Sequence, residues 1–243
     1  MILNLYKNIG ETPLNIIEKF KRENPEYEEI KMTYAGRLDP MAEGLLIILC
    51  GDEVHNKEKY LGLNKEYEFE ILFNVRTDTG DVLGIVETFE NKMIDEATLK
   101  DVLGDFVGKR TQKYPDYSSK TINGVPMWKK ARSGDVAEEI PEHEIEIFDL
   151  ELISTQKLIG KEIKEIAEEK IKKVEGDFRQ TEIINSWQER IDDKEQFFVV
   201  KVIANVSSGT YIRVLAEEIG VKLDTKGIAF SIKRTRVGDN ELQ

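Results

Sequence analysis

A loop that carries an aspartate and leads directly into an apolar segment constrains this chain more than any other feature. Asp39 stands between Gly36 and Gly44 and is followed by a proline. Residues 45–49 are apolar without polar alternation, which predicts a buried strand, although a buried helix segment has the same pattern. Glycine allows close backbone approach, and proline biases the residue before it away from helix. The segment therefore predicts either a carboxylate presented for chemistry or an aspartate that caps its own turn.

The composition limits the class of protein. A chain of 243 residues with 40% hydrophobic and 34% charged residues is long enough for one substantial core or two small domains. No apolar run approaches the ~18 residues that would span a bilayer, and the first residues lack a secretory pattern. The single cysteine, Cys50, cannot pair within the chain, which favours a reducing cytoplasm. Two histidines and one cysteine offer no cluster of metal ligands.

The distribution of charge is more informative than the net charge of −12. Seven bases and one acid between residues 107 and 134 give +6, and four bases without an acid between residues 225 and 238 give +4. A small basic surface on an acidic body can bind RNA, while the acidic remainder disfavours wrong docking. Solvated surface charges would give the same counts, so charge alone leaves RNA binding open.

Alternation and capping residues predict several elements. Residues 66–75 alternate apolar and polar side chains and give the clearest strand, with Tyr67 on the apolar face. Thr12 and Asp95 are each placed to cap a following helix. Two more strands are predicted at residues 143–153 and 197–206, and an amphipathic helix at about residues 157–174.

Two aspartates that follow the clearest strand, Asp78 and Asp81, could suggest a magnesium site because hard cations prefer carboxylate oxygens. No lysine or further acidic motif completes a phosphatase site around them. We therefore predict that both side chains form turns by accepting hydrogen bonds from backbone N–H groups.

Five sequence patterns occur in order along the chain and resemble those of the TruB-type tRNA pseudouridine synthases. The resemblance covers nearly the whole chain except residues 156–196 and the extreme C-terminus. The patterns are G-x-L-D-P-x-A-x-G-x-L at 36–46, T-D-T-G-D-x-x-G at 77–84, a thumb loop at 115–134 with Ser119 in place of alanine, S-x-G-T-Y-I-R-x-L-A-x-x-I-G at 207–220, and I-x-R-T-x-x-G at 232–238, where the family has leucine first.

The resemblance implies an α+β fold of the pseudouridine-synthase type, with a mixed, largely antiparallel sheet flanked by helices and an RNA-binding cleft across its middle. One catalytic domain would span residues 1–243. An RNA-contacting thumb would occupy about residues 109–140, where aromatic residues interleave with bases. A lineage-specific helical insertion would occupy about residues 156–196. We expect no further RNA-binding domain of the PUA type.

The implied activity is isomerisation of uridine 55 in the T loop of tRNA, with the target nucleotide flipped out of the stack. Asp39 would be the nucleophile, and Arg213 would keep it ionised and oriented. Tyr67 would lie against the target uracil and accept the C5 proton, and Tyr211 and Ile232 would complete the pocket. Further substrate contacts are implied for Tyr34, Arg37, Lys120 and Arg132. No metal, cofactor, membrane or obligate protein partner is expected, and the protein is expected to be a cytoplasmic monomer.

Two positions depart from the family pattern. Tyr34 stands where relatives usually have a histidine that fills the space left by the flipped base, and a tyrosine ring could stack there similarly. His55 stands where a lysine is usual, which would weaken one phosphate contact or make it depend on pH. Neither position contacts the predicted nucleophile.

Two other functions remain open from the sequence. The same cleft could serve a tRNA-binding and folding factor without turnover, although an intact set of Asp39, Tyr67 and Arg213 argues for catalysis. A retaining glycosidase could also use Asp39, since both chemistries cleave at an anomeric carbon. It would need a second carboxylic acid about 5–5.5 Å away, and Glu43 is the nearest candidate in sequence.

Overall fold

The protein is described by a computed structural model that covers residues 1–88, 92–122, 124–132 and 140–242. The apolar segment after Asp39 forms β3 (Ala42–Cys50), a strand buried almost throughout, as predicted. Two strands pair with it in antiparallel orientation, β1 (Ile2–Lys7) and β2 (Met32–Ala35). The Asp39 loop is therefore anchored on its C-terminal side by a strand in the interior of the sheet.

The central sheet is mixed and largely antiparallel, as predicted, with the strand order β1-β3-β12-β4-β11-β10-β7. The pairing of β3 with β12 is parallel, whereas the other pairs along this path are antiparallel. In this order β12, the last long strand of the chain, lies between β3 and β4, which come much earlier in the sequence. The remaining strands of this order are β4 (Lys65–Phe73), β7 (Gly108–Lys113), β10 (Glu142–Ile159), β11 (Gln196–Val206) and β12 (Gly227–Val237), and β13 (Asn240–Glu241) pairs with β12.

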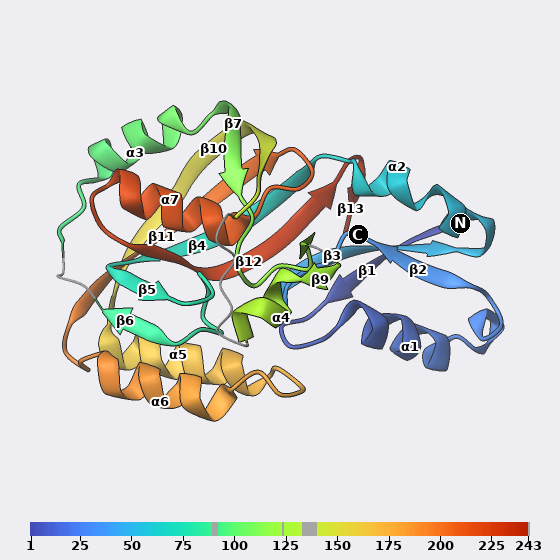
Figure 1. The fold of residues 1–243 in the computed structure, drawn as a ribbon, viewed down its shortest axis with the longest axis horizontal. Coiled ribbons are helices and arrows are strands. Elements are labelled where there is room, and N and C mark those ends of the chain that lie inside the picture. The colour runs from blue at the N-terminus through green and yellow to red at the C-terminus, as the bar shows by residue number, and fades with distance from the viewer. Residues whose placement is uncertain (89–91, 123, 133–139, 243) are drawn as a thin grey trace.

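Helices cover both faces of the sheet. Because side chains alternate along a strand, Phe69 and Ile71 of β4 share one core with α3 (Glu96–Asp105) and α7 (Ile212–Lys222), while Leu72 shares a second core with α5 (Gly160–Lys172) and α6 (Gln180–Arg190). Figure 1 shows α3 above α7, which lies in front of the strands, and α5 and α6 at the bottom of the view. The remaining described helices are α1 (Pro13–Glu23), α2 (Lys57–Leu61), α4 (Met127–Arg132) and the 3-10 turns Pro25–Tyr27 and Gly51–Asn56.

Both predicted helix caps are present. The Thr12 hydroxyl accepts a hydrogen bond from the backbone N–H of Asn15 at 3.2 Å, and an Asp95 carboxylate oxygen accepts one from that of Thr98 at 2.9 Å. Each satisfies one of the N–H groups that a helix leaves unpaired at its start. Among the described helices, none has the length and apolar composition to cross a bilayer.

Three predicted boundaries were wrong. The strand expected at residues 143–153 continues to Ile159, because β10 keeps its pairing with β11 as far as Gln196. The helix expected from residue 157 therefore starts at Gly160. The clearest strand ends at Phe73 rather than residue 75, because Asn74 has a left-handed φ of 65° that turns the chain into the β5–β6 hairpin (Val75–Thr77 and Val86–Thr88).

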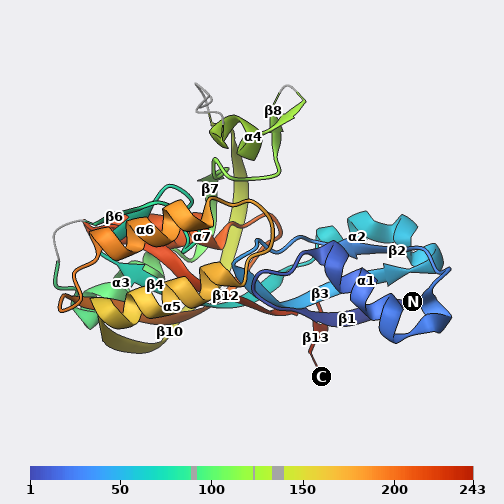
Figure 2. The same cartoon turned by 90° about the horizontal axis from the view of Figure 1, so that it is seen from below.

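The segment between β7 and β10 stands out from the rest of the molecule, which Figure 2 shows clearly for α4. It contains a two-stranded hairpin, β8 (Thr121–Ile122) and β9 (Val125–Pro126), followed by α4. We refer to residues 114–132 as the thumb segment. Gly134, part of the predicted thumb pattern, lies outside the described residues.

Candidate active site

The loop that carries Asp39 is held by a buried arginine from β12. Arg234 is 1% exposed and donates hydrogen bonds from Nε to the carbonyl of Leu45 (2.8 Å) and from Nη2 to that of Gly36 (3.2 Å). Its Nη1 lies 3.4 Å from the carbonyl of Arg37. One guanidinium thus satisfies backbone carbonyls on both sides of the loop, using its fixed fork of donors.

Gly44 permits this close approach. Its φ is 108°, and a Cβ built there would lie 2.2 Å from the backbone oxygen of Arg234. Any other residue would clash with the β12 backbone and adopt a strained conformation. The glycine that the sequence marked beside Asp39 is therefore required by the parallel contact of β3 with β12.

A buried lysine holds the same loop from the opposite side. Lys7, at the end of β1, donates from Nζ to the carbonyls of Ala42 (2.6 Å), Asp39 (3.2 Å) and Asn8 (3.1 Å). Burial lowers the pKa of Lys7 to about 8, although the negative charge of Asp39 acts to raise it. Neither Lys7 nor Arg234 was predicted to hold the loop. Arg234 stands in the I-x-R-T-x-x-G pattern, but a lysine or arginine that bonds only backbone carbonyls has no partner type that the sequence could reveal.

The structure brings Arg213 to Asp39, as the sequence predicted. The Nε of Arg213 donates to Oδ2 of Asp39 at 2.8 Å. Two further donors of the same guanidinium reach the carbonyls of Thr79 (Nη1, 2.6 Å) and Tyr117 (Nη2, 3.1 Å). The Arg213 side chain is 4% exposed and the Asp39 side chain is 40% exposed. The arginine is thus fixed in the interior while the carboxylate remains open to a ligand.

Arg213 reaches this place because the chain turns sharply before α7. Gly209 has a left-handed φ of 90°, and Tyr211 is the residue that precedes the first helical turn. The backbone N–H of Tyr211 donates to Oε1 of Gln112 at 2.8 Å, and Nε2 of Gln112 donates back to its carbonyl at 3.2 Å. The start of α7 is therefore tied to β7 through one buried amide side chain.

A second aspartate lies beside the same guanidinium. Oδ2 of Asp81 is 3.7 Å from Nε of Arg213, and burial raises the pKa of Asp81 to about 6 although Arg213 opposes the shift. The predicted turn role is confirmed, since Oδ1 of Asp81 accepts from the N–H of Leu83 and Oδ1 of Asp78 accepts from the N–H of Ile85. The contact of Asp81 with Arg213 was missed, because turn aspartates and charge partners look alike in sequence.

The predicted pocket residues lie on strands and a turn around Asp39. Tyr67 is 8% exposed and shares a core cluster with Leu38 and Ile232. Ile232 stands opposite Ala42 in the parallel pairing of β12 with β3. Burial, and then the charge of Asp39, raises the pKa of Tyr211 to about 12. The elements that carry Tyr67, Tyr211 and Ile232 therefore converge on the Asp39 loop.

The other predicted substrate contacts lie farther out. Tyr34 accepts a hydrogen bond on its hydroxyl from Nε of Arg37 at 3.2 Å. In the thumb segment, Nζ of Lys120 lies 4.8 Å from the centre of the Tyr114 ring. Nη2 of Arg132 donates to the backbone carbonyl of Asp177 (2.9 Å) and to its Oδ2 (3.3 Å), a partner that the sequence did not indicate.

The contacts of the described residues give no added support to the glycosidase alternative or to a metal site. Glu43, the second carboxylate considered for a glycosidase, accepts on Oε2 from the Tyr6 hydroxyl at 2.9 Å. Within the part of the chain that the structure describes, no three His, Cys, Asp or Glu side chains are grouped closely enough to hold a metal ion. The arrangement that remains is an oriented, accessible carboxylate supported by a buried guanidinium.

The fold is shared with solved complexes that contain Cbf5. It is similar to the structure described as a Cbf5-Nop10-Gar1 complex, with a TM-score of 0.59 and 18% identity, over all of this chain and 50% of that one. It is also similar to that of the archaeal box H/ACA sRNP Nop10-Cbf5 complex, with a TM-score of 0.57 and 17% identity, over all of this chain and 49% of that one.

The particular family follows from sequence similarity. The model of the TruB family pseudouridylate synthase (N terminal domain) matches residues 22–159, so the chain belongs to the TruB family. It is 30% identical over 95% of its length to a tRNA pseudouridine synthase B of Aquifex aeolicus and 31% identical over 99% to that of Thermosipho melanesiensis. It covers 66% and 65% of these relatives, so the chain spans about two thirds of their length.

Proposed function

We propose that the protein is a tRNA pseudouridine synthase that isomerises uridine 55 in the T loop. The observation that carries the proposal is the contact of Asp39 with Arg213, which presents a fixed and accessible carboxylate within the family's motif loop. Relatives named tRNA pseudouridine synthase B, matched over nearly the whole chain, support the choice of tRNA as substrate. The T arm of tRNA is the proposed partner, and the cytoplasm the proposed compartment.

The proposed reaction breaks the bond between C1′ and N1 of the uridine and forms one between C1′ and C5. The uracil turns between these steps while it is held in the pocket. One proton leaves C5 and one is gained at N1, so the product is an isomer and no redox equivalent is consumed. Asp39 acts as the nucleophile, either at the ribose or at the base.

The neighbouring residues have separate roles in the proposal. Arg213 keeps the carboxylate oriented, because its two other hydrogen bonds to carbonyls fix the guanidinium plane. Tyr67 lies against the uracil and accepts the C5 proton, and Tyr211 and Ile232 form the remaining walls. Tyr34, Arg37, Lys120 and Arg132 contact the RNA outside the pocket. The nucleotide must leave the stacked loop to reach Asp39, which costs a few kcal/mol of stacking.

We also propose that residues 1–243 form one catalytic domain. Its thumb would comprise about residues 109–140, and the segment at about residues 156–196 would be an insertion relative to the family pattern. The segment lies beyond the match to the N-terminal-domain model, which ends at Ile159, the residue that immediately precedes α5. A monomer without an obligate protein partner remains our expectation.

The test is tritium release from T-arm RNA labelled at C5 of uridine. Wild type should release tritium from the single T-loop uridine, whereas Asp39→Asn, which keeps the shape of the side chain and removes its charge, should not. Glu43→Gln serves as the matched control and should release tritium at the wild-type rate. Free uracil as the product of wild type, formed without tritium release and lost in Glu43→Gln, would favour the glycosidase.

Two other outcomes would also be decisive. A folded wild type that binds tRNA without releasing tritium would exclude the synthase and favour the folding factor. Equal release by wild type and Asp39→Asn would mean that the reaction is assigned correctly and the nucleophile is not.

A further inference from the structure

The helical hairpin α5–α6 contacts both sides of the candidate active site through its connector, residues 173–179. On the side of α1, a Cβ on Gly10 would lie 1.9 Å from the carbonyl oxygen of Lys173, so the two backbones are in direct contact. The N–H of Gly10 donates in turn to the carbonyl of Pro40, the residue after Asp39, at 2.9 Å. On the side of the thumb segment, Asp177 accepts from Arg132.

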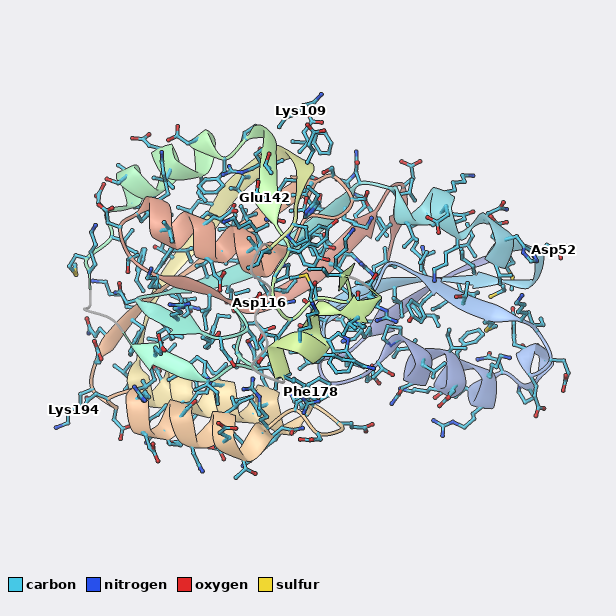
Figure 3. All side chains as sticks on the ribbon, in the orientation of Figure 1. Asp52, Lys109, Asp116, Glu142, Phe178 and Lys194 are labelled. Atoms are coloured by element: carbon cyan, nitrogen blue, oxygen red, sulfur yellow. The ribbon has the colours of Figure 1, made fainter. Side chains whose placement is uncertain are left out.

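Arg179, the last residue of the connector, contacts both the turn after β5 and the thumb segment. Its Nη2 forms an ion pair with Oδ2 of Asp78 at 2.8 Å, and its Cζ lies 5.6 Å from the centre of the Tyr117 ring. The hydroxyl of Tyr117 lies 3.4 Å from the same Oδ2 of Asp78. Figure 3 labels Phe178, the neighbour of Arg179, at the end of the hairpin nearest α4. One guanidinium therefore joins the turn after β5 to the thumb segment.

These two segments supply the carbonyl groups that hold Arg213. Nη1 of Arg213 donates to the carbonyl of Thr79, the residue after Asp78, and Nη2 donates to the carbonyl of Tyr117. Arg179 thus contacts the side chains of Asp78 and Tyr117, whereas Arg213 binds the backbone carbonyls of Thr79 and Tyr117. A displacement of either segment would move a carbonyl away from Arg213, and Arg213 sets the position of the Asp39 carboxylate at 2.8 Å.

The hairpin is itself fixed to the rest of the protein. The side chain of Trp187 is 1% exposed and donates from Nε1 to the carbonyl of Val82 at 3.2 Å. The hydroxyl of Ser186 accepts from the N–H of Val86 at 3.1 Å, and Nζ of Lys170 donates to the carbonyl of Phe230 at 2.7 Å. Because α6 is anchored on the β5–β6 hairpin and α5 on β12, the connector that carries Arg179 is held in a fixed position.

We infer that Arg179 is a positioning residue for the isomerisation, and that the α5–α6 hairpin stabilises the thumb segment over Asp39 through it. The inference rests on the proposed function. Arg179 contacts neither Asp39 nor the reacting uridine. It acts on Arg213 indirectly, through Asp78 and Tyr117. The hairpin begins where the family match ends, so this chain supplies the support from a part of its sequence outside that match.

The experiment compares Arg179→Met and Arg179→Lys with a matched control, Arg190→Met. Arg190 is exposed at the end of α6, on the same hairpin. Single-turnover tritium release and the Kd for T-arm RNA are measured for each protein. Since misplacement of a catalytic group by about 1 Å can cost about 100-fold in rate, Arg179→Met should lower the single-turnover rate constant by about tenfold to 100-fold, with an unchanged Kd.

The controls separate positioning from simple destabilisation. Partial unfolding would reduce the amplitude of the single turnover and leave its rate constant unchanged. Arg179→Lys keeps the charge opposite Asp78 and should restore part of the rate, and Arg190→Met should match wild type. A wild-type rate constant in Arg179→Met, or a higher Kd as its only change, would overturn the inference.

Amide hydrogen exchange provides a readout that needs no turnover. Exchange in residues 76–84 and 114–122 should be faster in Arg179→Met than in wild type or Arg190→Met. If wild type releases no tritium, the proposed function fails, and unchanged exchange in Arg179→Met would overturn the inference separately. Faster exchange in Arg179→Met would then still support the stabilisation of the thumb segment.

Discussion

Arg213 and Asp39 meet at 2.8 Å although 174 residues separate them in the chain. The arginine side chain is 4% exposed and the aspartate side chain 40%. Because the cation is buried, salt screens this pair less than it screens an exposed pair. The carboxylate gains a fixed orientation without losing its access to a ligand, which is the arrangement that a nucleophile requires.

Replacement of Arg213 by lysine tests whether the shape of the guanidinium matters beyond its charge. A lysine ammonium is a point charge and cannot reach Asp39 and the carbonyls of Thr79 and Tyr117 in the same fixed geometry. We expect the single-turnover rate constant to fall by about 100-fold or more. A fall of less than about threefold in a protein with a wild-type melting temperature would show that charge alone is sufficient.

Gly44 should tolerate no side chain. A Cβ there would lie 2.2 Å from the carbonyl oxygen of Arg234 at a φ of 108°, so Gly44→Ala should destabilise the protein by about 2–5 kcal/mol. Gly104→Ala is the control, because a Cβ built at that position in α3 would meet no atom within 4 Å apart from its chain neighbours and the backbone of its own helix. It should stabilise by about 0.5–1 kcal/mol. Urea unfolding measures both, and equal effects would contradict the close approach of β12.

Glu217, one turn after Arg213, should make stability depend on pH. Burial raises the pKa of Glu217 from 4.5 to about 7, although the positive charge of Arg213 acts to lower it. Between these values the folded state binds more protons at Glu217 than the unfolded state, so this group destabilises the fold as pH rises from about 4.5 to 7. Glu217→Gln removes the titration.

The measurement for Glu217 is the difference in unfolding free energy between Glu217→Gln and wild type. It should grow with pH across this window, by at most about 3 kcal/mol. A difference that stays constant from pH 4.5 to 7, or shrinks, would show that the pKa is not raised.

Trp128 in α4 should contribute to RNA binding and little to stability. Its side chain is 37% exposed on the thumb segment, where a base could stack on it. A stacked base is worth about 1–3 kcal/mol, so Trp128→Ala should raise the Kd for T-arm RNA by at least about fivefold. Phe148→Ala on β10, which is 43% exposed, is the control and should leave the Kd unchanged. A similar increase in both variants would indicate general surface effects.

The sequence predicted the two residues at the centre of the candidate site. Asp39 and Arg213 stand in patterns whose glycines, Gly44 and Gly209, take left-handed conformations, at the contact of β3 with β12 and at the turn before α7. Such positions restrict the residue type, so their spacing is visible in a single sequence. The strand alternation at residues 66–75 was equally informative, because one buried face imposes a period of two.

The residues that were missed act through backbone carbonyls or through partners distant in the chain. Lys7 and Arg234 bond to carbonyl groups, which every residue carries, so no partner type in the sequence identifies them. Arg179 pairs with Asp78 across 101 residues, and nothing local distinguishes it from a surface arginine. The length of β10 depends likewise on its partner strand β11, which local periodicity does not contain.

The position of β12 between β3 and β4 has a consequence for synthesis of the protein. In the strand order of the central sheet, β1 and β3 are joined to β4, β11, β10 and β7 through β12. Arg234, which holds the Asp39 loop, lies in that strand. A ribosome must therefore translate almost to residue 237 before the loop acquires its support, although Asp39 leaves the exit tunnel much earlier. The candidate site is therefore completed late in synthesis, when β12 joins the two parts of the central sheet.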